Sequence, residues 1–199
     1  MKRDEPRNAR MIGFLNVKKL SATLAICVML LSITPALFAQ RDVHASLITS
    51  VDRKPAPAFR LMAETANFAR LTDYRGKVVL LNFWATDCGG CVLEIPSIID
   101  IQSAFKNEGF TVVGVSMDIS YEDLRDAKQA WGKVKPFIAK RKINYPIVMG
   151  SESLFKEFGL TQLPDTLLID KTGRVAAVYV GIVNKDNVEA NIRKLLSEQ

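Results

Sequence analysis

The sequence has 199 residues, of which 48% are hydrophobic, so it fits one ordinary domain with a sizeable core and is too apolar for wholesale disorder. Its formal net charge is +6, but residues 1–45 hold seven basic and three acidic groups and so account for +4 of it. The nearly neutral remainder lacks the clustered basic surface that nucleic acids require, and we therefore expect no nucleic-acid partner.

Residues 1–45 are predicted to be an export segment. A basic stretch ends at Lys18-Lys19 and precedes "LSATLAICVMLLSITPALFA", residues 20–39, which contains no charge. A cleaved signal and an uncleaved membrane anchor formed by residues 20–39 are equal alternatives, because about 20 apolar residues also span a bilayer. The lysines before the run would send the rest of the chain outward in either case. We expect a periplasmic or otherwise extracytoplasmic domain.

Signal peptidase cleavage is expected near the end of this segment. Val43 and Ala45 offer a minus-three and minus-one pair, and Ala39 is the second choice. A linker over residues 46–57 is then expected to lead into a domain over residues 58–199.

The domain is expected to begin with a hairpin and a buried strand. "AFRLMAETANFARL", residues 58–71, alternates around Glu64, which predicts a hairpin. "DYRGK" predicts a turn at Gly76. "VVLLNFW" is apolar on both faces, which indicates a central strand covered by helices.

The sequence then alternates helices and strands. "VLEIPSIIDIQSAFKNEG" has apolar residues at helical spacing, with Pro96 inside the helix and Gly109 closing it. A strand "FTVVGVSMD" and a long polar helical stretch follow, the latter over residues 121–142 with candidate breaks at Gly132 or Pro136. The remaining elements are a short strand "YPIVMG", a short helix "SESLFKEFG", a hairpin "DTLLIDKTGRVAAVYVG" and a closing helix "NKDNVEANIRKLLSEQ". This order predicts an α/β fold with a mixed central β-sheet flanked by helices.

Cys88 and Cys91 are separated by two glycines directly after the apolar strand. Three interpretations compete: a dithiol that cycles with a disulfide, half of a metal site, or two small buried residues. A disulfide that closes so short a loop stabilises little, which argues against a structural staple. A zinc site needs four ligands, yet Cys27 lies in the export segment and His44 is the only histidine. We therefore expect no metal and favour a reactive pair.

The strand-to-helix turn suits a reactive thiol at Cys88. Unpaired N–H groups and the positive end of the helix dipole stabilise a thiolate, which is the attacking species in disulfide exchange. Cys88 is expected to be exposed and nucleophilic, and Cys91, one turn on, to be more buried and to resolve a mixed disulfide. Schemes of the Ser-His-Asp and Cys-His kinds lack a histidine. The proline and threonine of thiol peroxidases are replaced by Leu81 and Ala85.

Several motifs together resemble the TlpA/ResA/CcmG group of exported thioredoxin-fold oxidoreductases. They are "GKVVLLNFWATDCGGCVLEIP", "VVGVSMD", "YPIVMG" and "FGLTQLPDTLLIDKTGRV", and the resemblance runs from about Pro55 to the C-terminus. It implies a thioredoxin-like fold with an N-terminal β-hairpin and a helical insertion, and no cofactor. It also implies partners: exported proteins that bear disulfides, and a membrane electron donor of the thiol-transfer type.

The resemblance also implies site residues. Cys88 and Cys91 match the redox pair, and Pro164 matches the cis-proline that faces it. Pro164, Leu163 and Trp84 would contact the substrate. Glu94 matches an acid beneath the pair that moves protons to and from the thiols, and its spacing from Cys91 puts the two on adjacent helical turns. The alternative for Glu94 is an exposed carboxylate at the start of the helix.

Two departures from the group stand next to the dithiol. Asp87 occupies a position where the group usually has tryptophan, and a carboxylate there should raise the pKa of the Cys88 thiol unless it points away. Gly89 and Gly90 stand where a proline is common, which predicts a more flexible backbone. Both affect the expected potential and choice of partner, and neither affects the fold.

The expected function is that of an exported thiol-disulfide oxidoreductase that reduces protein disulfides, with apocytochrome c among the substrates of the group. The direction of electron flow follows from the resemblance alone. One alternative is a disulfide-forming oxidant, which a strongly depressed Cys88 pKa would favour. The other is a redox-inert binding or chaperone module.

Overall fold

The structure is a computed structural model that describes residues 42–198. The expected export segment, apart from its last few residues, lies outside the described residues, and so does Cys27. Within residues 42–198 no helix is both long enough and apolar enough to cross a membrane.

A five-stranded mixed sheet with the order β5-β4-β3-β6-β7 forms the centre of the domain. Its strands are β3 (Val78–Trp84), β4 (Phe110–Ser116), β5 (Ile147–Met149), β6 (Asp165–Ile169) and β7 (Val175–Val180). Strands β3, β4 and β5 run parallel, whereas β6 runs antiparallel to both β3 and β7. Every residue of β3 is buried. The predicted α/β fold with a mixed central sheet is confirmed.

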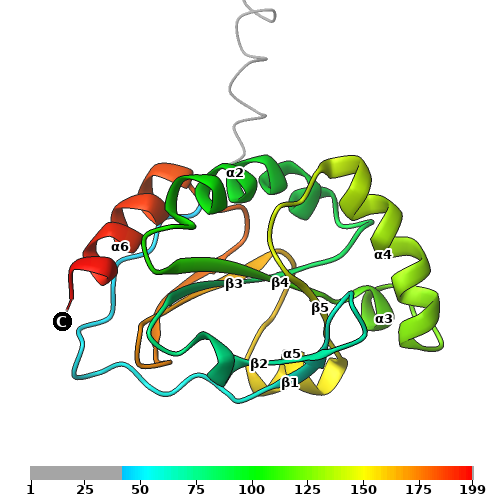
Figure 1. Cartoon of the computed structure of the whole chain (residues 1–199), viewed down its shortest axis with the longest axis horizontal. Coiled ribbons are helices and arrows are strands. Elements are labelled where there is room, and N and C mark those ends of the chain that lie inside the picture. The colour runs from blue at the N-terminus through cyan, green and yellow to red at the C-terminus, as the bar shows by residue number, and fades with distance from the viewer. Residues whose placement is uncertain (1–41, 199) are drawn as a thin grey trace, which may run out of the picture. The chain divides into compact units, whose positions relative to one another are not determined.

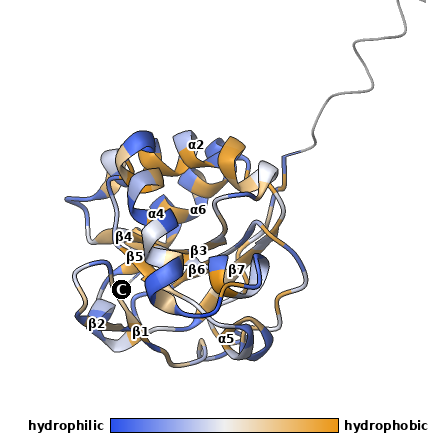
Figure 2. Cartoon of the chain, turned by 90° about the vertical axis from the view of Figure 1, so that its right-hand side faces the viewer, coloured by the Kyte–Doolittle hydropathy of each residue, from blue (hydrophilic) through white to orange (hydrophobic). Residues whose placement is uncertain are grey.

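Helices cover one face of this sheet (Figure 1). They are α2 (Gly89–Phe105), α4 (Ala127–Arg141) and α6 (Lys185–Ser197), which bury apolar side chains in one core cluster with β3. The other face carries the hairpin β1 (Arg60–Met62) and β2 (Phe68–Arg70), the 3-10 helix η2 (Leu71–Tyr74) and α5 (Glu152–Glu157). The central strands are coloured mainly as hydrophobic in Figure 2, as burial on both faces requires.

The predicted hairpins are both present. Strands β1 and β2 pair antiparallel with Arg60 opposite Arg70, and Ala63 forms a bridge to Val148 of the edge strand β5. Strands β6 and β7 pair across the predicted turn, in which Gly173 has a φ of +80°. Helix α2 continues through Pro96 and ends at Phe105, so Gly109 makes the turn into β4 and does not cap the helix.

The predicted breaks in the long polar stretch are wrong. Helix α4 runs unbroken through Gly132 and Pro136, and the interruption comes earlier, between α3 (Asp118–Tyr121) and α4. There Asp126 caps α4 by accepting a hydrogen bond from the N–H of Gln129 at 2.8 Å. Trp131 and Val134 are buried on either side of Gly132, and such packing outweighs the low helix propensity of glycine and proline.

The stretch before the hairpin lies along the edge strand β7. Val43 donates a backbone hydrogen bond to Ile182 at 2.7 Å and accepts one from Asn184 at 3.0 Å. Further on, Ile48 donates to Ala176, and Val175 donates to Lys54. The residues expected to form a linker are therefore hydrogen-bonded to the domain, and Val43 and Ala45 are part of it.

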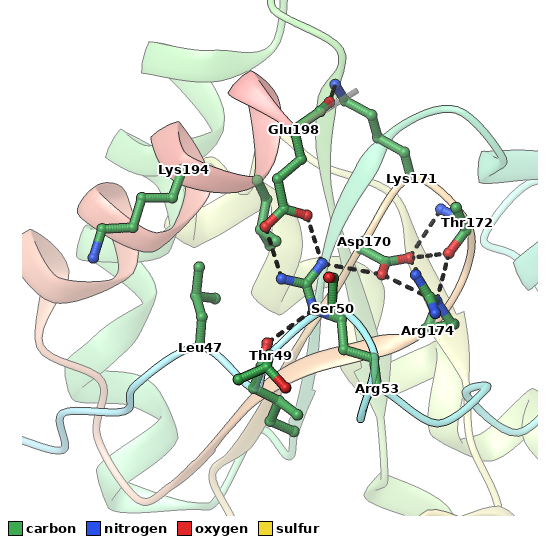
Figure 3. Close-up of a pocket in the computed structure, with 12 residues that line it drawn as sticks. Leu47, Thr49, Ser50, Arg53, Asp170, Lys171, Thr172, Arg174, Lys194 and Glu198 are labelled. Atoms are coloured by element: carbon green, nitrogen blue, oxygen red, sulfur yellow. Dashed lines mark hydrogen bonds and ion pairs between the residues drawn. The ribbon is translucent and has the colours of Figure 1, made fainter.

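Arg53 anchors this segment to Asp170 and Glu198 (Figure 3). Its guanidinium is buried between Asp170, at 3.2 Å, and Glu198, which it contacts through two nitrogens at 2.6 and 2.7 Å. Asp170 directly follows β6, and the first residue of β6 pairs with Phe83 near the end of β3. The Arg53 cluster therefore lies one strand length from the dithiol. Because the charges satisfy one another, we assign the cluster a structural role.

Candidate active site

Cys88 and Cys91 form a disulfide at the start of α2. Cys88 is the N-cap residue of this helix, and its sulfur accepts a hydrogen bond from the N–H of Cys91 at 3.2 Å. The predicted placement at the strand-to-helix turn is therefore present. The expected exposure of Cys88 is wrong for this oxidised state, because Cys88 is 3% exposed and Cys91 is fully buried.

Pro164 lies against the dithiol turn. The Leu163–Pro164 peptide bond is cis, and Pro164 is buried. A Cβ atom on Gly90 would lie 3.2 Å from Cδ of Pro164 and 3.6 Å from Cγ1 of Ile182, whereas a Cβ atom on Gly89 would have no neighbour within 4 Å. Of the two glycines, Gly90 is thus the one whose missing side chain allows the close approach to Pro164.

Glu94 is buried beneath the dithiol, with 1% of its surface exposed. Its Oε1 accepts a hydrogen bond from Nδ2 of Asn82 at 2.7 Å, and its Oε2 accepts one from the N–H of Val183 at 3.2 Å. Burial raises the pKa of Glu94 to about 7, although both hydrogen bonds favour the ionised form and act against this rise. The alternative of an exposed carboxylate at the helix start is wrong. One turn from Cys91, this acid can change its protonation near neutral pH.

Two polar residues around Glu94 were not identified from the sequence. Asn82 donates to Thr166 at 2.9 Å as well as to Glu94, and so connects β3, α2 and β6. Asp165 directly follows Pro164, is 2% exposed, and has its pKa raised to about 6 by burial against the opposing effect of backbone hydrogen bonds from Thr166 and Thr161. The one polar residue inside "VVLLNFW" was a signal for Asn82.

The three residues expected to contact substrate fall into different environments. Trp84 is 1% exposed and packs on Phe137 of α4, with ring centroids 5.3 Å apart, so the expected substrate contact is corrected to a core position. Its strand is buried on both faces, which leaves no path to the surface. Leu163 is half-buried and lines a pocket of about 260 Å³ with Met117, Tyr121 and other residues. Leu163 thus borders a partly apolar hollow, and the next residue, Pro164, lies against the dithiol turn.

Asp87, the departure beside Cys88, pairs with a cation from α4. Its Oδ2 lies 2.8 Å from Nζ of Lys133 in α4, and Lys133 also contacts Glu122. Thr86, just before it, donates its backbone N–H to Asp118 at 3.0 Å. Lys133 and Asp118 were not identified from the sequence, since each lies more than thirty residues away from its partner in the chain.

This arrangement can perform thiol-disulfide exchange. One sulfur sits at a helix N-terminus, a second sulfur lies one turn on, and an acid with a pKa near neutrality follows at the next turn. Among residues 42–198 no three His, Cys, Asp or Glu side chains gather closely enough to hold a metal ion.

Known proteins with similar sequences and structures carry names from this chemistry. A family model described as the AhpC/TSA family matches residues 53–178. The thiol-disulfide oxidoreductase ResA of Geobacillus kaustophilus is 30% identical over 141 residues, which cover 70% of this chain and 75% of that protein. The thioredoxin-like protein YneN of Bacillus subtilis is 27% identical over 137 residues, which cover 69% of this chain and 76% of YneN.

A solved structure from Chlorobium tepidum, assigned as the thiol:disulfide interchange protein DsbE, superimposes with a TM-score of 0.64 at 30% identity. The match covers 73% of this chain and 97% of that one. The family model covers well over half of this chain and includes the dithiol and Pro164. The chain therefore belongs to the AhpC/TSA family of thioredoxin-fold proteins and is a relative of the ResA thiol-disulfide oxidoreductases.

Proposed function

We propose that this thiol-disulfide oxidoreductase works outside the cytoplasm and reduces disulfides of exported proteins, with Cys88 as the attacking residue and Cys91 as the resolving residue. The single observation that carries the proposal is the buried Glu94 one turn from Cys91, with its pKa raised to about 7. A structural disulfide has no need of a buried acid that titrates near neutrality, whereas proton transfer to and from thiols does.

The reaction is proposed to proceed in two exchanges. The Cys88 thiolate attacks one sulfur of the substrate disulfide, the substrate S–S bond breaks, and the other substrate sulfur leaves as a thiolate that takes a proton from solvent. The Cys91 thiol then passes its proton to the Glu94 carboxylate, and the Cys91 thiolate attacks the Cys88 sulfur. The second substrate thiolate leaves and is protonated. Two electrons pass to the substrate, and the enzyme is left with the Cys88–Cys91 disulfide.

A dithiol partner must then reduce the enzyme again. We propose a membrane electron donor of the thiol-transfer type, which would attack the Cys88–Cys91 disulfide and leave oxidised. Apocytochrome c, whose cysteines must be reduced before haem attachment, is the substrate that we propose to test first. Leu163, which lines the hollow, and Pro164, which lies against the dithiol turn, would receive the substrate backbone.

The export segment is proposed to end before the folded domain. Cleavage after Ala45 would remove two backbone groups that are bonded within the domain, because Ala45 donates to Asn187 at 3.0 Å and accepts from Asn191 at 2.9 Å. Of the two expected positions, cleavage at Ala39 is therefore favoured, with a retained anchor over residues 20–39 as the alternative.

Turnover of an oxidised model protein by the reduced enzyme tests this function. Wild type is expected to reduce insulin disulfides, Cys88→Ser to lose turnover, and Cys91→Ser to accumulate a mixed disulfide at Cys88 that gel electrophoresis without reductant detects. If Cys88→Ser still binds its partner and turnover is absent in wild type, the protein is a binding module.

A disulfide-forming oxidant is the second candidate, and the N-cap position of Cys88 favours it. The hydrogen bond from Cys91 and the helix dipole stabilise a Cys88 thiolate, and a stabilised reduced form makes a stronger oxidant. Oxidation of a reduced model protein by the disulfide form, compared with the reverse reaction, separates the two.

A further inference from the structure

Lys133 joins α4 to the residue before the first active-site cysteine. Its Nζ lies 2.8 Å from Oδ2 of Asp87 and also contacts Glu122. The Lys133 side chain is 36% exposed, that of Glu122 is 14% exposed and that of Asp87 is 66% exposed, so the pair with Glu122 is shielded from solvent and the pair with Asp87 is a surface pair. Both acids raise the pKa of Lys133, Asp87 more than Glu122, and the amine therefore stays charged.

A second set of contacts fixes the neighbouring Thr86. Its backbone N–H donates to Asp118 at 3.0 Å, and its hydroxyl lies 2.5 Å from Asp118 and 3.1 Å from Glu122. Asp118 is fully buried and also accepts from Ser116 at 2.7 Å. The residues just before Cys88 are thus bonded to Asp118 of α3, to Glu122 and, through Lys133, to α4.

Three carboxylates therefore contact Thr86 or Lys133 near the segment that leads into the dithiol: Asp87, Asp118 and Glu122. Negative charge close to a cysteine disfavours its thiolate, which is the reactive species. The ammonium group of Lys133 lies between two of them and cancels part of their field. The helix N-terminus then dominates the environment of the Cys88 sulfur.

We propose that Lys133 is a positioning residue for the dithiol, which neutralises Asp87 and holds its carboxylate on α4, so that Cys88 keeps its thiolate character despite an adjacent acid. This inference rests on the proposed function for its importance in turnover. The effect of Lys133 on the Cys88 thiol can be measured without a substrate.

The test is the pH dependence of Cys88 alkylation by iodoacetamide in the reduced protein, followed by mass spectrometry of the peptide that contains Cys88. The variants are Lys133→Met, Asp87→Asn and the double variant, with Lys135→Met as the matched control, since Lys135 is exposed on the same helix. Thermal melting checks that each variant is folded.

At pH values below the thiol pKa, Lys133→Met is expected to slow alkylation by about twofold to fivefold. This factor corresponds to the loss of one partly exposed ion pair. Asp87→Asn should be as fast as wild type or faster, and the double variant should match Asp87→Asn, because the lysine has nothing left to neutralise. Lys135→Met should match wild type. The loss in Lys133→Met should shrink in 1 M salt, which screens the carboxylate.

Two results would overturn the proposal. One is a Lys133→Met profile that coincides with that of wild type. The other is a double variant as slow as Lys133→Met, which would show that Lys133 acts through packing and not through Asp87. A wild-type protein without a reversible Cys88–Cys91 couple would instead overturn the proposed function, and the alkylation profiles would still decide the role of Lys133.

Discussion

Oε2 of Glu94 lies 3.2 Å from the backbone nitrogen of Val183 and accepts its hydrogen bond. This contact joins the helix that carries the dithiol to the turn after β7. The residues on either side of Val183 bind the backbone of Val43, so the buried acid, the turn and the N-terminal segment form one connected unit.

Ionisation of Glu94 is expected to make the protein less stable as the pH rises. Burial raises the pKa of Glu94 to about 7 from an ordinary value of 4.5, so between these values the folded state keeps a proton that the unfolded chain releases. The free energy of unfolding is therefore highest at pH values below the pKa of the unfolded chain. It falls as the pH rises through the pKa of the folded state, by up to about 3 kcal/mol at pH 8.

Glu94→Gln is expected to remove this dependence. Urea unfolding of wild type at pH 5 and pH 8 should show the fall, and the variant should show a smaller one. Asp165, whose pKa is raised to about 6, contributes in the same direction, so Asp165→Asn serves as the control for its share. An equal fall in wild type and Glu94→Gln would contradict the assigned protonation.

The second step of the reaction should depend on the same proton. Resolution of a mixed disulfide at Cys88 is expected to speed up as the pH rises through about 7, because ionised Glu94 can accept the Cys91 proton. Glu94→Gln should lose this inflection, while the initial attack by Cys88 keeps its own pH profile. Rapid-quench kinetics with a small mixed disulfide measures the two steps separately, and an unchanged inflection in the variant would exclude Glu94 as the base.

The sequence predicted well those features that local pattern determines. A nearly continuous apolar run specified β3, alternation around Glu64 specified the first hairpin, and "DKTG" specified the turn between β6 and β7. The spacing of Cys88, Cys91 and Glu94 along one helix likewise placed them on adjacent turns.

Features that depend on distant parts of the chain could not be predicted. Asn82 looked like an interruption of an apolar strand, and only the pairing of β3 with α2 and β6 reveals it as a donor to Glu94. The partner of Asp87 comes from α4, 46 residues further along the chain. Trp84 was misassigned for a related reason, since Phe137 of that same helix packs on it.

Gly90→Ala is expected to impair the site, whereas Gly89→Ala is not. The new methyl group at position 90 would meet Pro164 at 3.2 Å, and such overpacking costs roughly 1–3 kcal/mol or displaces the proline loop. At position 89 there is open space, and alanine is favoured over glycine in a helix. The free energy of unfolding and the rate of insulin reduction should both fall for Gly90→Ala, and neither should fall for Gly89→Ala. Equal values for the two variants would contradict the close contact.

Removal of residues 1–45 is expected to destabilise the domain, whereas removal of residues 1–41 is not. The longer deletion loses the backbone bonds of Val43 and Ala45 and the apolar contact of Val43 with the core, together worth about 2–4 kcal/mol. Urea unfolding of the two truncated proteins provides the comparison. Equal stabilities would mean that the N-terminal segment adds nothing, and cleavage after Ala45 would again fit.

The central claim is that the Cys88–Cys91 couple donates electrons to protein disulfides, and its reduction potential tests this most directly. The purified protein is equilibrated in graded dithiothreitol buffers, and the disulfide fraction is read by thiol alkylation and mass spectrometry. We predict a reversible couple well below about −200 mV, which requires a reducing partner. A value near roughly −120 mV would make the protein an oxidant, and the absence of any reversible couple would contradict the enzymatic account altogether.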